Sequence, residues 1–198
     1  MANRDAKPKR KIAGRTSTDY RIGIAYDGEL TEDAYFRSWQ QLLSQGALSI
    51  FPNYVKSGGN PLVAVQAAIA IHAAHTDYAE FWCVCDVDGA NAHTINSAKQ
   101  LAASKGIRLA LSDRCFEVWL ALHFKTVTVP IATEAEAIAL ITPHQANYGT
   151  PRKLPDFKLF FPNTLTALAN ADWLSQQGLV NPSTNVHSLV KKLLSNVI

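Results

Sequence analysis

The chain has 198 residues, of which 47% are hydrophobic and 18% are charged, and its formal net charge is +3. These proportions suit a single domain with a sizeable core and exclude a chain that is disordered over its whole length. No apolar run approaches the roughly 20 residues of a membrane-spanning helix, and the three cysteines form no C-x-x-C pair. We therefore expect a soluble cytoplasmic protein with free thiols.

Residues 1–19 are predicted to form a flexible basic arm. Lysines and arginines follow one another there, interrupted by Pro8 and Gly14, and no apolar run occurs. The arm is either a solvated tail that aids solubility or a segment that attracts phosphate groups. On the second interpretation, its candidate nucleic-acid-binding residues are Lys9, Arg10 and Lys11.

Residues 20–130 alternate between short apolar runs and segments with helical spacing. The runs predict strands at residues 20–26, 48–55, 80–85 and 107–111. The first helix is expected to be capped by Thr31 and to end at Gly46, and three further helices are predicted at residues 62–74, 92–104 and 115–124. Asn60 is a predicted N-cap, and Pro52 places the second strand near a sheet edge. This alternation predicts an α/β core with a parallel sheet flanked by helices.

Residues 131–198 are predicted to form a helical C-terminal extension packed on the core. Helical spacing occurs at residues 133–141, 163–177 and 184–197. The segment between the first two is polar and rich in turn formers, and it contains Arg152 and Lys153. Together with Lys158, these are the basic residues best placed along the chain to reach back toward a phosphate group.

Acidic residues gather at three places where an apolar run ends. They are Asp27-Gly28-Glu29, Asp86-Val87-Asp88, and Asp113 with Glu117. In an open α/β sheet, the carboxyl ends of the parallel strands line the crevice in which ligands bind. Carboxylates that converge there repel one another unless a hard cation such as Mg²⁺ lies between them. The pattern therefore predicts a metal site.

Asp86 and Asp88 are the strongest metal-ligand candidates. Residues two apart on an extended backbone point the same way, so both carboxylates would face one spot. The alternative is an ordinary Asp-x-Asp-Gly turn whose carboxylates cap the next helix. Asp27 is a weaker candidate because Asp-Gly is a frequent turn, although Gly28 permits a ligand to approach the backbone closely.

Glu117 lies in a predicted helix that is apolar almost all round. Such a helix is buried, and a buried carboxylate without a partner is too costly to keep. Its partner is either Arg114, in a structural ion pair, or a metal ion shared with Asp86 and Asp88. Asp113 is either the N-cap of this helix or a further member of the acidic group. His123, near the helix end, is a packing residue more often than a catalyst.

Four segments resemble signatures of the RloB-like protein family. Residues 27–36, DGELTEDAYF, resemble the motif EG-x-x-TE-x-x-YF, and residues 112–124 resemble S-x-x-CFE-x-WL-x-x-HF. Asp86-Val87-Asp88 matches a D-x-D motif, and residues 181–186 resemble NP-x-T-x-V. The likeness covers the chain from about Tyr20 onward. Asp27 stands where the family has Glu, so its carboxylate is shorter by one methylene group, and Glu29 or Glu32 could compensate for this.

This resemblance implies a TOPRIM-like fold and a metal-dependent nuclease of a bacterial phage-defence or restriction-linked system, often with an ATPase partner. Asp86, Asp88 and Asp27 would then bind Mg²⁺ or Mn²⁺, and Asp27, Glu117 and Lys153 would be catalytic. Arg152 and Lys158 would neutralise phosphates of the bound nucleic acid. The sequence does not choose between DNA, RNA and tRNA.

Two other functions remain open at this point. The first is a haloacid-dehalogenase-like phosphatase, because Asp86-Val87-Asp88-Gly89 resembles that family's nucleophile motif. Against it, the usual Thr is replaced by Ala90 and the motif does not follow the first strand. The second is a catalytically silent TOPRIM-like subunit that docks to an ATPase or senses a ligand, which the change at Asp27 keeps possible.

Overall fold

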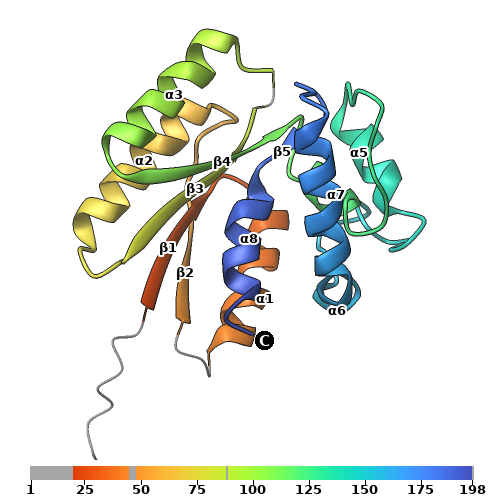
Figure 1. Ribbon diagram of the computed structural model, residues 1–198, viewed down its shortest axis with the longest axis horizontal. Helices are drawn as coiled ribbons and strands as arrows, with labels where there is room; N and C mark the ends of the chain where they lie inside the picture. The colour runs from red at the N-terminus through yellow and green to blue at the C-terminus, as the bar shows by residue number, and fades with distance from the viewer. Residues whose placement is uncertain (1–19, 45–47, 88, 198) are drawn as a thin grey trace, which may run out of the picture.

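The computed structural model describes residues 20–44, 48–87 and 89–197 (Figure 1). It contains a five-stranded sheet in the order β2-β1-β3-β4-β5. The first four strands run parallel, and β5 pairs antiparallel with β4. The strands are β1 (Tyr20–Tyr26), β2 (Leu48–Tyr54), β3 (Glu80–Asp86), β4 (Ile107–Asp113) and β5 (Ser183–Thr184). The predicted parallel sheet flanked by helices is therefore confirmed.

Helices cover both faces of the sheet. Figure 1 shows α2 and α3 on one face and α1 and α8 on the other, with α5, α6 and α7 grouped beyond β5. The helices are α1 (Thr31–Leu43), α2 (Pro61–Ala74), α3 (Ala92–Ser104), α4 (Glu117–Ala121), α5 (Glu134–Ile141), α6 (Phe157–Phe160), α7 (Thr164–Gln176) and α8 (Val186–Leu194). A single 3₁₀ turn, Phe161–Asn163, joins α6 to α7.

Strand alternation divides the buried side chains into two cores. Trp82 and Val84 of β3 belong to the larger core beneath α1, α4 and α8, whereas Cys83 and Cys85 belong to the smaller core beneath α2 and α3. Both cysteines are free thiols, as expected, and they pack on one side of the sheet. Because side chains alternate along a strand, Asp86 is directed to the same face as Trp82 and Val84.

One predicted cap and one predicted edge strand are confirmed. The Asn60 side chain accepts hydrogen bonds from the backbone N–H groups of Leu62 and Val63, at 3.0 and 3.4 Å, so it caps α2 as expected. Pro52 lies in β2, an edge strand, as its missing N–H group predicted.

Three local predictions are wrong. Thr31 is the first residue of α1 and not its N-cap, because its hydroxyl group is used in contacts with distant residues described below. Asp113 does not cap the next helix: it is the last residue of β4, and α4 begins only at Glu117. Thr184 lies in β5, so the last helix begins at Val186.

The C-terminal segment is tied to the sheet by more than helix packing. After β5, the Asn185 side chain donates to the carbonyl oxygen of Leu109 (2.9 Å) and accepts from the N–H group of Leu111 (2.5 Å). Its amide thus hydrogen-bonds with β4 as a neighbouring strand would. Lys192 on α8 forms an ion pair with Glu80 at the start of β3. No helix of the described ranges is long and apolar enough to cross a bilayer.

Candidate functional site

The sheet has a topological switch point between β1 and β3. The chain leaves β1 for β2 on one side and then crosses back to β3 on the other side of β1. In open α/β sheets, ligands bind outside the carboxyl ends of the strands at such a point. Asp27 directly follows β1 and Asp86 ends β3, so both carboxylates border the switch point.

An acidic cavity of about 250 Å³ opens there. We call it the acidic cavity, and its lining residues are Asp27, Gly28, Glu29, Glu32, Gly59, Asp86, Glu117 and Lys153. The structure thus brings together four of the predicted site residues, from β1, β3, α4 and the segment that precedes α6. The predicted convergence of carboxylates at the strand ends is seen for Asp27, Asp86 and Glu117.

Other predicted site residues lie elsewhere. Asp88, Lys9, Arg10 and Lys11 are outside the described residues. Arg152 is exposed beside Lys153 in the chain, and Lys158 lines a separate surface groove against α1.

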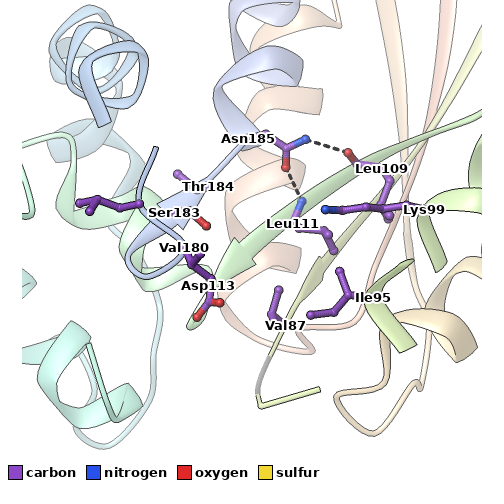
Figure 2. A pocket seen from close by; sticks show the side chains of 11 residues that line it. Val87, Ile95, Lys99, Leu109, Leu111, Asp113, Val180, Ser183, Thr184 and Asn185 are labelled. Carbon is purple, nitrogen blue, oxygen red and sulfur yellow. Dashed lines mark hydrogen bonds between the residues drawn. The ribbon is translucent and has the colours of Figure 1, made fainter. Parts of the chain in front are cut away.

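Asp113, although it ends a parallel strand, faces a different groove. This groove of about 550 Å³ lies beside β4, between α3 and the segment leading into β5 (Figure 2). Its walls are mostly apolar, and Lys99 and Asp113 are the charged side chains that line it. Asp113 is therefore not part of the acidic cavity.

Glu32, considered from sequence only as a residue that could compensate for the shorter Asp27, is a member of the cavity. Its place in the first turn of a helix suggests an acid that interacts with the helix dipole, yet it is only 4% exposed. The helical spacing does indicate that Glu32 is buried. Glu32 precedes the buried Tyr35 and Phe36 by three and four residues, so it lies on the same inward face of α1. Gly28 makes room for it: a Cβ atom at Gly28 would overlap the Glu32 carboxylate.

Burial and the repulsion between carboxylates raise the pKa values of two acidic residues in the cavity. Burial, followed by the negative charges of Glu117 and Asp27, raises the pKa of Glu32 to about 8. Burial and then the charge of Glu32 also raise the pKa of Asp86 well above its ordinary value. Near neutral pH the cavity therefore retains protons that isolated carboxyl groups would have released.

Glu117 is held by three described partners. It is 2% exposed, and its Oε1 atom accepts hydrogen bonds from the hydroxyl groups of Tyr148 (2.9 Å) and Thr31 (3.3 Å). The ammonium group of Lys153 lies 3.6 Å from the same oxygen. The buried Glu117 carboxylate therefore has the hydrogen-bond partners that a buried charge requires, and Lys153 supplies a positive charge beside it. Arg114, the partner considered from sequence, lines a neighbouring cavity that also includes Asp86.

Lys153 is anchored at both its backbone and its side chain. Its carbonyl oxygen accepts a hydrogen bond from Thr31 Oγ1 (3.0 Å), and its ammonium group also forms an ion pair with Glu134 at the start of α5. Burial alone would lower the pKa of Lys153, but Glu117 and Glu134 raise it above its ordinary value. Thr31, Glu134 and Tyr148 were not predicted as site residues, because their contacts join segments that are distant in sequence.

Asp27 is also fixed by a neighbouring loop. The hydroxyl group of Ser57, which follows β2, donates a hydrogen bond to Asp27 Oδ2 at 2.8 Å. Ser57 in turn accepts one from the N–H group of Gly59 at 3.2 Å. The carboxylate at the end of β1 is therefore held by the loop that follows β2 as well as by its own backbone.

His123 lies away from the acidic cavity. It is buried among the rings of Tyr35, Trp119 and Phe160, and desolvation lowers its pKa to about 4. Its Nδ1 atom lies 3.2 Å from the carbonyl oxygens of Trp119 and Leu120. These contacts support the packing interpretation of His123.

The chemistry of the cavity suits a hard cation. Carboxylate oxygens are the ligands that Mg²⁺ prefers. Burial and then carboxylate repulsion raise the pKa values of Glu32 and Asp86, and a cation would relieve the repulsion. Within the described ranges, however, no group of three or more His, Cys, Asp or Glu side chains is arranged so that it could hold a metal ion. Asp88, the second aspartate of the Asp-x-Asp motif, is outside these ranges.

Comparison with known proteins identifies the family. Neither the curated proteins nor the solved structures contain a match to this chain. The model of the RloB-like protein family matches residues 22–193, which include every described residue of the acidic cavity. This match spans most of the chain, and the protein therefore belongs to the RloB-like family.

Proposed function

We propose that the protein is a metal-dependent nuclease that hydrolyses phosphodiester bonds of nucleic acids. The observation that carries the proposal is the meeting of Asp27, Glu32, Asp86 and Glu117 in one cavity at the topological switch point. Membership of the TOPRIM superfamily, a role in phage defence or restriction, a cytoplasmic location and an ATPase partner belong to the same proposal. They follow from the family resemblance.

Asp86 and Asp88 are the proposed holders of Mg²⁺ or Mn²⁺, with Asp27 as a further ligand. When bound, such an ion polarises the phosphoryl group and acidifies the attacking water. Their oxygen atoms fit this role because they are hard, anionic donors.

The remaining cavity residues have separate roles in this proposal. Glu32, with a pKa of about 8, is mostly protonated near neutral pH and is therefore suited to donate a proton there. Lys153 reaches into the cavity and would stabilise negative charge that develops on the phosphate. Glu117, held by Tyr148 and Thr31, keeps the Lys153 ammonium group at the cavity.

Substrate binding requires additional positive charge, because the acidic cavity repels a phosphate backbone. Arg152 and Lys158 are exposed, and the arm of residues 1–19 supplies Lys9, Arg10 and Lys11. Binding through such residues weakens steeply as salt concentration rises.

The experiment compares Asp86→Asn with the matched control Asp113→Asn, which changes the aspartate at the end of the adjacent strand but outside the cavity. Both are incubated with single-stranded and duplex DNA and RNA in Mg²⁺, Mn²⁺ or EDTA. We expect cation-dependent cleavage by wild type and by Asp113→Asn, and a fall of at least about 100-fold in Asp86→Asn. Equal cleavage by both variants contradicts the assignment.

The catalytically silent subunit is the second candidate function, and one observation favours it. The Lys153 ammonium group already lies among the carboxylates, where it offsets part of their charge without a bound ion. This candidate is supported if wild type cleaves no nucleic acid under any of these conditions while Mg²⁺ still raises its melting temperature.

A further inference from the structure

Ser57 connects the acidic cavity to the loop that follows β2. It is 9% exposed, and its hydroxyl group lies 2.8 Å from Asp27 Oδ2. Thirty residues separate the two in sequence, so the contact exists because β1 and β2 are adjacent parallel strands whose carboxyl ends lie together. Ser57 does not itself line the cavity, but Asp27 and Gly59 do.

The loop fixes the direction in which the Ser57 hydroxyl donates. Gly58 and Gly59 have φ values of 64° and 74°, which favour glycine, and this turn brings the Gly59 N–H group to 3.2 Å from Ser57 Oγ. The hydroxyl oxygen therefore accepts from Gly59, and its single proton is directed to Asp27. Asn60 caps α2 immediately afterwards, so the loop is held at its far end as well.

We propose that Ser57 is a positioning residue that sets the orientation of the Asp27 carboxylate and thereby the affinity of the acidic cavity for a divalent cation. The inference rests on the proposed function. The Ser57 hydroxyl group holds the Oδ2 atom of Asp27 and so limits rotation of its carboxylate. Removal of a residue that orients a metal ligand in this way commonly weakens metal binding by about 10–100-fold.

A purely structural role for Ser57 predicts a different result. In that case its hydroxyl group only stabilises the turn, and removing it lowers the melting temperature without changing cation affinity. Ser38 provides the matched control, since it is also partly buried and its hydroxyl group donates only to a backbone oxygen, that of Ala34, at 2.8 Å.

The experiment measures Mn²⁺ affinity by calorimetry and melting temperature for full-length wild type, Ser57→Ala, Ser57→Thr and Ser38→Ala. We expect Ser57→Ala to weaken Mn²⁺ binding by about 10-fold and Ser57→Thr, which keeps the hydroxyl group, to restore it. Ser38→Ala should bind Mn²⁺ as wild type does. Equal affinities of Ser57→Ala and Ser38→Ala overturn the inference.

Crystal structures of wild type and Ser57→Ala separate this inference from the proposed function. If wild type binds no Mn²⁺ and cleaves nothing, the proposed function fails. The two crystal structures then test the positioning role of Ser57 without a bound cation. A rotated Asp27 carboxylate in Ser57→Ala supports this role, and an unchanged Asp27 carboxylate overturns it.

Discussion

The raised pKa of Glu32 should make the stability of the protein depend on pH, and the variant Glu32→Gln tests this dependence. Glutamine keeps the size of the side chain but cannot ionise. In the wild type, burial and the charges of Glu117 and Asp27 raise the pKa of Glu32 from 4.5 to about 8. We predict that the variant is more stable than wild type at alkaline pH when divalent cations are absent.

The sign follows from proton binding. Between pH 4.5 and about 8 the folded protein holds a proton on Glu32 that the unfolded chain has released. The contribution of Glu32 to the free energy of unfolding is therefore highest below pH 4.5 and falls by about 1.4 kcal/mol per pH unit between pH 4.5 and about 8. From about pH 5 to about pH 9, wild type should lose about 4 kcal/mol relative to Glu32→Gln, and the loss should level off above the folded pKa.

Urea unfolding at pH 5, 7 and 9 in the presence of EDTA measures this difference. Glu29→Gln is the matched control, because Glu29 lines the same cavity but is exposed. A difference between wild type and Glu32→Gln that is the same at pH 5 and pH 9 would refute the reasoning. So would an equally large pH dependence of the difference between wild type and Glu29→Gln.

Two further predictions use other residues. Gly28→Ala should lower stability by about 1–3 kcal/mol, because its Cβ atom would displace the Glu32 carboxylate; thermal unfolding of Gly28→Ala with and without Glu32→Ala should show that the second change removes most of the cost. His123 has a pKa of about 4, below its ordinary 6.5, so the stability that its neutral form provides is complete above pH 6.5 and should fall by about 3 kcal/mol as the pH drops to 4. An NMR titration that gives His123 a pKa near 6.5 contradicts this.

The sequence predicted the parts of the fold that depend on local pattern. Each of the four parallel strands is a short apolar run, and the end of a parallel strand fixes where the next residue lies. For this reason the meeting of Asp27 and Asp86 could be expected from the order of the strands, although the same reasoning fails for Asp113, which ends β4 but faces another groove. The Asn60 cap has a similarly local cause, since the side chain bonds to N–H groups two and three residues ahead.

The parts that the sequence did not predict depend on contacts between distant segments. Glu32 in a first helical turn is explained equally well by the helix dipole, and only the position of α1 against the sheet shows that it is buried. Thr31 resembles an N-cap in sequence, but its hydroxyl group bonds to Glu117 and to the backbone of Lys153. The two-residue strand β5 has no periodic pattern at all and exists because β4 is beside it.

The amide of Asn185 also bears on how copies of this protein meet in solution. An open sheet edge offers backbone groups to any passing strand, and proteins that leave such an edge bare tend to join edge to edge. Here a side chain occupies the groups of Leu109 and Leu111 on one border, and on the opposite border β2 carries Pro52, which cannot donate. These two features therefore hinder strand addition at the backbone groups that they occupy or remove.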